Sequence, residues 1–130
     1  MIFNRETIDN KVNELKKVII NLQKGDESIL RALLNDLDNC SRREISAGLE
    51  TIEIKEKINK KKEEIRELKK KKDFSAQFEL TLKEPELSRL VEELSKAKTQ
   101  EKEYKRQYNV KFKEYEKFLD KIYKKYLDIK

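Results

Sequence analysis

The chain has 130 residues, of which 45% are charged and only 36% are hydrophobic. Average soluble domains carry about 25% charged and about 45–50% apolar residues, so this chain cannot enclose a thick globular core. Two glycines and one proline are too few for folds that are rich in turns. The composition therefore predicts long helices with narrow apolar stripes, in one helical domain over residues 1–130.

The same composition argues against most enzyme chemistry. The chain has no histidine, which is the commonest general base at neutral pH and the commonest metal ligand. Two isolated glycines cannot form a phosphate-binding loop, and no pair of carboxylates is set apart from the surrounding lysines. We therefore expect no catalytic residue, no metal site and no cofactor.

Cysteine usage and hydropathy favour a soluble cytoplasmic protein. Cys40 is the only cysteine, which excludes a disulfide within the chain and fits a reducing compartment. Residues 1–11 lack the apolar stretch of a signal peptide, and no apolar run approaches the roughly 20 residues that span a bilayer. No membrane contact is expected. A small chain rich in Lys, Ile and Asn also suits an accessory protein of an AT-rich bacterium or its phage.

Two helices are predicted in the N-terminal third. The first covers residues 5–24, and its apolar side chains share one face because they follow at steps of three and four: Ile8, Val12, Leu15, Ile19 and Leu22. Gly25 suits the left-handed position that ends a helix. The second covers residues 27–39, with its stripe at Leu30, Leu33, Leu34 and Leu37.

A third, long helix is predicted over residues 41–72. It begins at a capping box, because Ser41 and Glu44 have the S-x-x-E spacing. Its apolar face shifts along the helix, from Ile45, Leu49 and Ile52 to Ile54, Ile58, Ile65 and Leu68, with Lys61 among the latter. Cys40 precedes this helix beside two arginines, which favours either a reactive thiolate or, as we expect, a small residue that fills a helix junction.

Residues 73–84 form the predicted connector, and 74–82 within it have the pattern of a strand. Apolar side chains alternate with polar ones over "FSAQFELTL", which is typical of a short extended segment. A lone strand is unstable, so it would pair with the N-terminal residues 1–3, a second copy or another protein. Partner-binding candidates are Phe74, Phe78, Leu80 and Leu82, and the alternative is packing within its own fold.

The last helix is predicted over residues 85–129, with Pro85 in its first turn. Its apolar and aromatic residues repeat as heptads with one four-residue stutter near Tyr108, and only Glu101 interrupts them. The predicted fold is an all-α, elongated antiparallel coiled coil or helical bundle. The candidate seam and oligomer residues are Leu87, Leu90, Leu94, Tyr108, Phe112, Tyr115, Leu119, Ile122 and Tyr126.

The apolar stripe of this last helix broadens near its C-terminal end, where Phe118, Tyr123 and Leu127 flank the seam. A pair of helices cannot cover so wide a face. Either the N-terminal helices fold back over it or a second chain covers it, and we expect a homodimer.

The basic excess is concentrated in two places, the stretch "INKKKEEIRELKKKK" at 58–72 and the C-terminal helix. Seven lysines and one arginine against three glutamates give the first a net charge of +5. Most of these charges suit a solvated helix face. The surplus leaves a nucleic-acid contact open, with candidates Lys60, Lys61, Lys62, Lys69, Lys70, Lys71 and Lys72.

The sequence therefore predicts a coiled-coil protein without enzymatic activity that binds another protein, as an adaptor, an assembly or export chaperone, or a small inhibitor. The alternative is a nucleic-acid-binding protein that uses the lysine run and the basic C-terminal helix.

Overall fold

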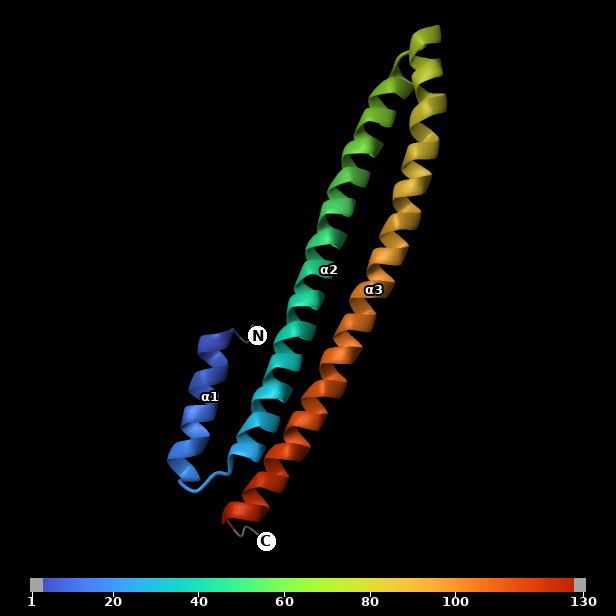
Figure 1. Ribbon diagram of the computed structural model, residues 1–130. Coiled ribbons are helices and arrows are strands. Elements are labelled where there is room, and N and C mark those ends of the chain that lie inside the picture. Colours follow the sequence, from blue (N-terminus) through green and yellow to red (C-terminus); the bar gives the residue numbers. More distant parts are fainter. Residues whose placement is uncertain (1–3, 128–130) are drawn as a thin grey trace. The chain divides into compact units, whose positions relative to one another are not determined.

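The computed structural model describes residues 4–127 as three helices (Figure 1). α1 covers Arg5–Val18, α2 Lys24–Lys70 and α3 Phe74–Leu127, and residues 4–127 contain no strand. The predicted all-α helical bundle is confirmed. The chain forms two compact units, Met1–Glu44 with Glu103–Lys130 and Ile45–Lys102. We call them the three-helix unit and the two-helix unit, and α2 and α3 contribute to both.

α1 begins at a side-chain cap and ends earlier than predicted. The Oδ1 atom of Asn4 accepts a hydrogen bond from the backbone N–H of Thr7 at 2.8 Å, which satisfies a donor that the helix leaves unpaired. The helix ends at Val18 rather than at residue 24, because Ile19 leaves helical geometry at φ −113° and ψ 88°. Its side chain is then only 1% exposed, so the turn is stabilised by burial.

Gly25 does not end the first helix as predicted. It lies in the first turn of α2, which begins at Lys24, and its φ is outside the left-handed region. The connection between α1 and α2 is made instead by residues 19–23, where the N–H of Leu22 donates to the carbonyl oxygen of Ile19 at 3.4 Å.

The core of the three-helix unit joins α1 to both longer helices. Its buried members are Ile8, Val12, Leu15, Ile19, Leu30, Leu34, Leu37 and Ile122. Fully burying a large aliphatic side chain contributes about 1.5–3 kcal/mol, whereas an isolated helix as short as α1 is marginal in water. Tertiary packing therefore holds α1 in place.

α2 continues through Cys40 and Ser41, where the sequence pattern predicted a break between helices at 27–39 and 41–72. Both residues are buried, at 6% and 4% exposure, and they follow Leu37 on the inward side of the helix. This packing overrides the capping signal of Ser41, and no Gly or Pro interrupts residues 26–47. α2 ends at Lys70, close to the predicted end.

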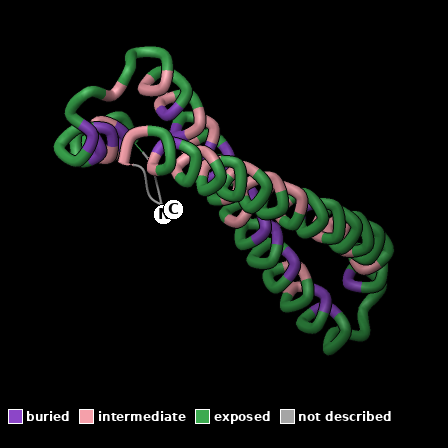
Figure 2. Tube along the Cα trace, turned by 90° about the horizontal axis from the view of Figure 1, so that it is seen from below, coloured by how far each residue is buried: buried purple, intermediate pink, exposed green. Residues whose placement is uncertain are grey.

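In the two-helix unit, α2 and α3 run antiparallel. Contacts between the helices join Thr51 with Glu101 and Lys61 with Glu86. Residue numbers on α3 therefore fall as those on α2 rise. Buried positions recur at helical intervals along α2 (Figure 2). They are Ala47, Thr51, Ile54, Ile58, Ile65 and Leu68.

The strand predicted at 74–82 is wrong, since these residues form the first turns of α3. The Oδ1 atom of Asp73 accepts a hydrogen bond from the N–H of Ala76 at 2.8 Å and so caps the helix. Counting back from Leu87 by four, three and four residues gives Lys83, Leu80 and Ala76. These three are half-buried or buried, so the heptad series extends through the segment.

One further prediction about α3 is affected by its early start. Pro85 lies inside the helix rather than in its first turn, at an exposed position where its ring meets solvent. The predicted end at residue 129 and the suggested strand partner at residues 1–3 lie outside the described residues.

Candidate functional site

The predicted seam residues of the two-helix unit pack within the chain. Leu87, Leu90 and Leu94 contact a small buried cluster of Ile54, Ile58 and Ala97. The interface between α2 and α3 thus uses these three leucines.

The predicted seam residues of the three-helix unit are used in the same way. Tyr108, Tyr115, Leu119 and Tyr126 pack around the buried Ile122 and the core that includes α1. Phe112 is 37% exposed and lies at the edge, with its ring centroid 6.2 Å from that of Tyr108. α1 therefore covers the broad aromatic face, which is the intrachain alternative to a second chain. The homodimer stays a prediction.

Tyr126 also fixes the start of α2. Its hydroxyl accepts a hydrogen bond from the N–H of Gln23 at 3.1 Å and donates one to Asp26. The ammonium group of Lys125 lies 2.9 Å from the same carboxylate. The Tyr126 hydrogen bond first, and Lys125 second, lower the pKa of Asp26 below its ordinary value of 3.8, against an opposing effect of desolvation.

The lysine run is partly neutralised by α3. Lys61, the one predicted to interrupt the seam, lies 2.7 Å from Glu86 and 3.6 Å from Glu64. Glu64 also accepts from Lys83 at 2.8 Å. The hydrogen bond to Glu86 is the main cause that raises the pKa of Lys61. The intrusion of a lysine into the seam is therefore compensated by carboxylates from both helices.

The other candidate lysines are more exposed. Lys70 pairs with Glu67 on the same helix at 3.3 Å. Within residues 4–127, the remaining ones make no ion pair: Lys60, Lys62, Lys69, Lys71 and Lys72. The basic surplus of the sequence is thus largely a solvated surface at the end of the two-helix unit.

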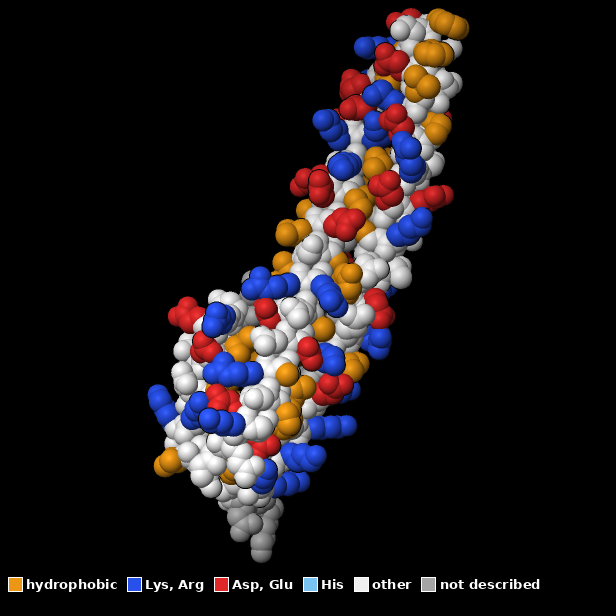
Figure 3. Space-filling view, viewed as in Figure 1, with side chains coloured by type: hydrophobic (Ala, Val, Ile, Leu, Met, Phe, Trp, Pro, Cys, Tyr) orange, Lys and Arg blue, Asp and Glu red, His pale blue; other side chains and the backbone are white. Residues whose placement is uncertain are grey.

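The partner-binding candidates divide between the two sides of α3. Leu80 is half-buried on the inward side, because it belongs to the heptad series. Phe74, Phe78 and Leu82 are 84%, 58% and 55% exposed, and we call them the α3 row. Hydrophobic side chains follow one another on the outer side of the first turns of α3 (Figure 3). Their spacing of four residues places all three on one face.

A second outward row was not recognised from the sequence. Ile45, Leu49 and Ile52 were interpreted as the first part of the apolar face of the predicted third helix, and they are 42%, 63% and 54% exposed. We call them the α2 row. Two apolar series overlap over residues 45–58, and only one of them can face α3. The sequence did contain a signal for the buried series. The spacing of the α2 row continues into the polar Glu56 and Asn59, whereas the series that begins at Ile54 continues into Ile58.

Glu101, the one polar residue in the predicted seam, has a partner on α2. Its Oε2 atom lies 3.1 Å from the hydroxyl of Thr51, which is 4% exposed and also lies 3.0 Å from the carbonyl oxygen of Ala47. A methyl group added at Gly48 would lie 3.6 Å from Glu101 Oε1. Small residues on α2 thus leave room for the carboxylate, and the contact fixes the register of the helices.

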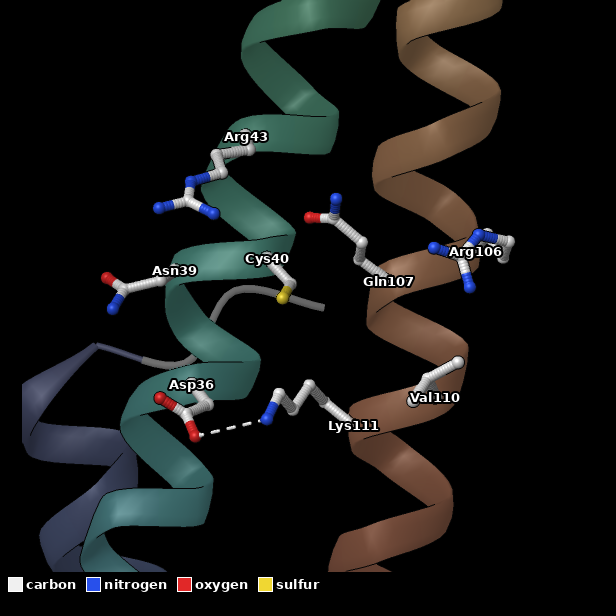
Figure 4. Close-up of a pocket in the computed structure, with 8 residues that line it drawn as sticks. All are labelled: Asp36, Asn39, Cys40, Arg43, Arg106, Gln107, Val110 and Lys111. Carbon is white, nitrogen blue, oxygen red and sulfur yellow. Dashed lines mark ion pairs between the residues drawn. The ribbon is translucent and has the colours of Figure 1, made fainter.

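Cys40 is a free cysteine at a buried position inside α2. A pocket of about 240 Å³ beside it is lined by Asp36, Arg43, Arg106 and Lys111 among others. In Figure 4, Arg43 extends away from the sulfur, and Asp36 and Lys111 point toward each other, at 3.8 Å. Because α2 is continuous, Cys40 is also not at a helix N-terminus. The packing interpretation is favoured.

Residues 4–127 present neither a grouping of metal ligands nor a membrane-spanning helix. That part of the chain contains no cluster of three or more Cys, Asp or Glu side chains arranged to hold a metal ion. None of its three helices has a stretch apolar enough and long enough to cross a bilayer. Comparison with protein-family models, with curated proteins and with solved structures finds no match to this chain.

Proposed function

We propose that the chain is a helical protein without enzymatic activity that acts by binding another protein, as an adaptor, an assembly or export chaperone, or a small inhibitor. The observation that carries this proposal is the pair of apolar rows, the α2 row and the α3 row, which both face solvent in the two-helix unit. Single exposed apolar residues are common, but contiguous groups on one face mark interaction sites.

The spacing of the rows supports helices as partners. Ile45, Leu49 and Ile52 follow at steps of four and three, which is the anchor pattern of a helix that lies against another helix. The α2 row is purely aliphatic, and the exposed Lys55 and Glu56 follow it. Charges at the edge of an apolar contact favour orientation and specificity over raw affinity.

The proposal places this activity in the cytoplasm. Cys40 is a free, buried cysteine, and unpaired thiols are usual in reducing compartments.

A second candidate is binding of nucleic acid, and the observation that favours it is the group of exposed lysines without an ion-pair partner. Lysines attract phosphates without reading bases. Such binding would be nonspecific. Because Lys61 and Lys70 are already paired with glutamates, we rank this function below protein binding.

Site-specific photo-cross-linking in cells of the source organism tests the proposal. A photoreactive phenylalanine analogue replaces Leu49 or Phe78, and a control carries it at Val110, which is 43% exposed in the three-helix unit. The proposal expects protein to be captured from the row positions, the same species or a different one at each, and not from Val110. Equal capture from all three positions, or capture of nucleic acid alone, contradicts it.

A salt titration distinguishes nucleic-acid binding, the second candidate, from the proposed protein binding. Fluorescence anisotropy with a labelled single-stranded or double-stranded oligonucleotide is measured from low salt to about 0.15 M. Tight binding at the higher salt that is lost when Lys69, Lys71 and Lys72 become glutamine would favour nucleic acid. Weak binding that fades with salt is expected.

A further inference from the structure

The outward face of α3 is free of charge over its first three turns. Beside Phe74, Phe78 and Leu82, the helical spacing places Thr81 and Pro85 on this face, and all five are exposed. We infer that this face docks against the same face of a second copy of the chain, with the two α3 helices antiparallel. The inference rests on the proposed function, because it assigns a partner to one of the two rows.

The size of the face limits the area that such a contact can bury. A phenylalanine presents about 150–250 Å², so exposures of 84% and 58% leave roughly 300 Å² on the two rings, and Leu82 brings the total to roughly 400 Å². Two copies would bury about twice this area, or about 1,000 Å² with the edges included, which is the lower limit for a specific interface. The contact therefore suits a weak dimer that depends on concentration.

Charge is distributed unevenly along this part of the chain. Four lysines, residues 69–72, precede the uncharged face, and "EPELSRLVEE" at 84–93 follows it with four glutamates and one arginine. The segment thus has a charge of +4 at one end and −3 at the other. Glu86 is paired with Lys61 and Lys70 with Glu67. Within residues 4–127, Lys71, Lys72, Glu84, Glu92 and Glu93 make no ion pair.

This polarity selects the antiparallel arrangement. In a parallel pair the two lysine clusters would meet, and like charges in contact are unfavourable. In an antiparallel pair with Phe78 beside Leu82 of the second copy, Lys72 of each chain lies near the middle of residues 84–93 of the other. The face is then complementary to itself, as a twofold contact requires.

Analytical ultracentrifugation of the full chain between about 1 and 500 µM tests the inference, because small interfaces give micromolar or weaker dissociation constants. We expect a monomer–dimer equilibrium. Phe78→Ser should weaken it at least tenfold while the helical content stays unchanged, since Phe78 is already 58% exposed. Leu49→Ser, at 63% exposure on the α2 row, is the matched control and should leave the equilibrium unchanged.

Charge reversal tests the orientation. The pair Lys71→Glu and Lys72→Glu should weaken dimerisation about fivefold, and adding Glu92→Lys with Glu93→Lys should restore it. If the lysine reversals strengthen the dimer, the helices are parallel and the inference is wrong. It is also overturned by a monomer at all concentrations, or by dissociation with Leu49→Ser instead of Phe78→Ser. A monomer that still captures another protein through position 78 would leave the proposed function standing.

Discussion

Lys61 of α2 lies 2.7 Å from Glu86 of α3, at a position where the seam of the two-helix unit would otherwise carry an apolar side chain. The lysine side chain is 21% exposed and the glutamate 44%. A partly exposed ion pair stabilises little, whereas an apolar side chain in a seam gains from burial. The ion pair therefore allows a lysine at this seam position but adds little to the stability of the two-helix unit.

Replacing Lys61 by leucine should stabilise the two-helix unit. The introduced side chain would pack between Ile58 and Ile65, and the freed Glu86 would remain hydrated, so we expect a rise in Tm on the order of a few degrees. Thermal unfolding followed by circular dichroism measures it. Lys70→Leu is the control, because Lys70 is 66% exposed and should give no rise. A lower Tm for Lys61→Leu would mean that the ion pair outweighs burial.

Acid should weaken the three-helix unit through Asp26. Its pKa is lowered below 3.8 by Tyr126 and Lys125, so the folded chain binds this proton more weakly than the unfolded chain. The stabilisation is then present above about pH 4 and is lost as the pH falls through the lowered pKa. We expect Asp26→Asn to lower Tm at about pH 7 and the difference to vanish near pH 2.

Tyr126→Phe tests the cause of that pH dependence. It removes the hydroxyl that makes the leading contribution to the low pKa of Asp26 and keeps the ring in the core. It should therefore flatten the same acid transition. A constant difference in Tm between wild type and Asp26→Asn at every pH would contradict the assignment.

Gly48→Ala should stabilise the chain by about 0.5–1 kcal/mol, because glycine inside a helix is unfavourable relative to alanine. The new methyl group would meet Glu101 Oε1 at 3.6 Å, an ordinary contact distance. Urea denaturation measures the free energy of unfolding. Gly25→Ala, with open space around it in the first turn of α2, should give a smaller gain. A loss of stability in Gly48→Ala would show that the Thr51–Glu101 contact needs the space.

Truncation of two leucines of α2 should have very different effects on stability. Leu34 is fully buried in the core beneath α1 and Leu49 is 63% exposed. We expect Leu34→Ala to cost about 2–5 kcal/mol and Leu49→Ala to stay within about 0.5 kcal/mol. Chemical denaturation of the two variants side by side checks this. Similar losses would place Leu49 in a buried contact.

Helix type and inward faces could be predicted where a single apolar series was present. Ile8 to Leu15 in α1, and Leu87 to Ala97 in α3, each follow one heptad pattern and lie where that pattern puts them. The prediction of a strand at 74–82 failed because apolar residues on both sides of a helix can produce the same alternating pattern as a strand. Leu80 decides between them, since only the helix continues the spacing of Leu87.

The candidate site was less predictable because it depends on which of two series faces inward. Ile45, Leu49 and Ile52 are as regular as Ile54 and Ile58, and only the polar residues that continue the first series, Glu56 and Asn59, distinguish the two. The register that pairs Thr51 with Glu101 decides which series is buried, and register is a property of both helices together. The pairing of Lys61 with Glu86 depends on the same register.

The hydrogen bond from Gln23 to Tyr126 joins positions 103 residues apart in the chain, and its consequence concerns the order of folding. The two-helix unit is closed by a connection of only three residues between Lys70 and Phe74, so its first contacts need little loop closure and can form early. α1 leaves the ribosome before α2 and α3 but lacks most of its apolar cover until residues 108–127 have been synthesised. The earliest of the three helices is thus the last to be buried, and until then it is the part most exposed to aggregation and to chaperones.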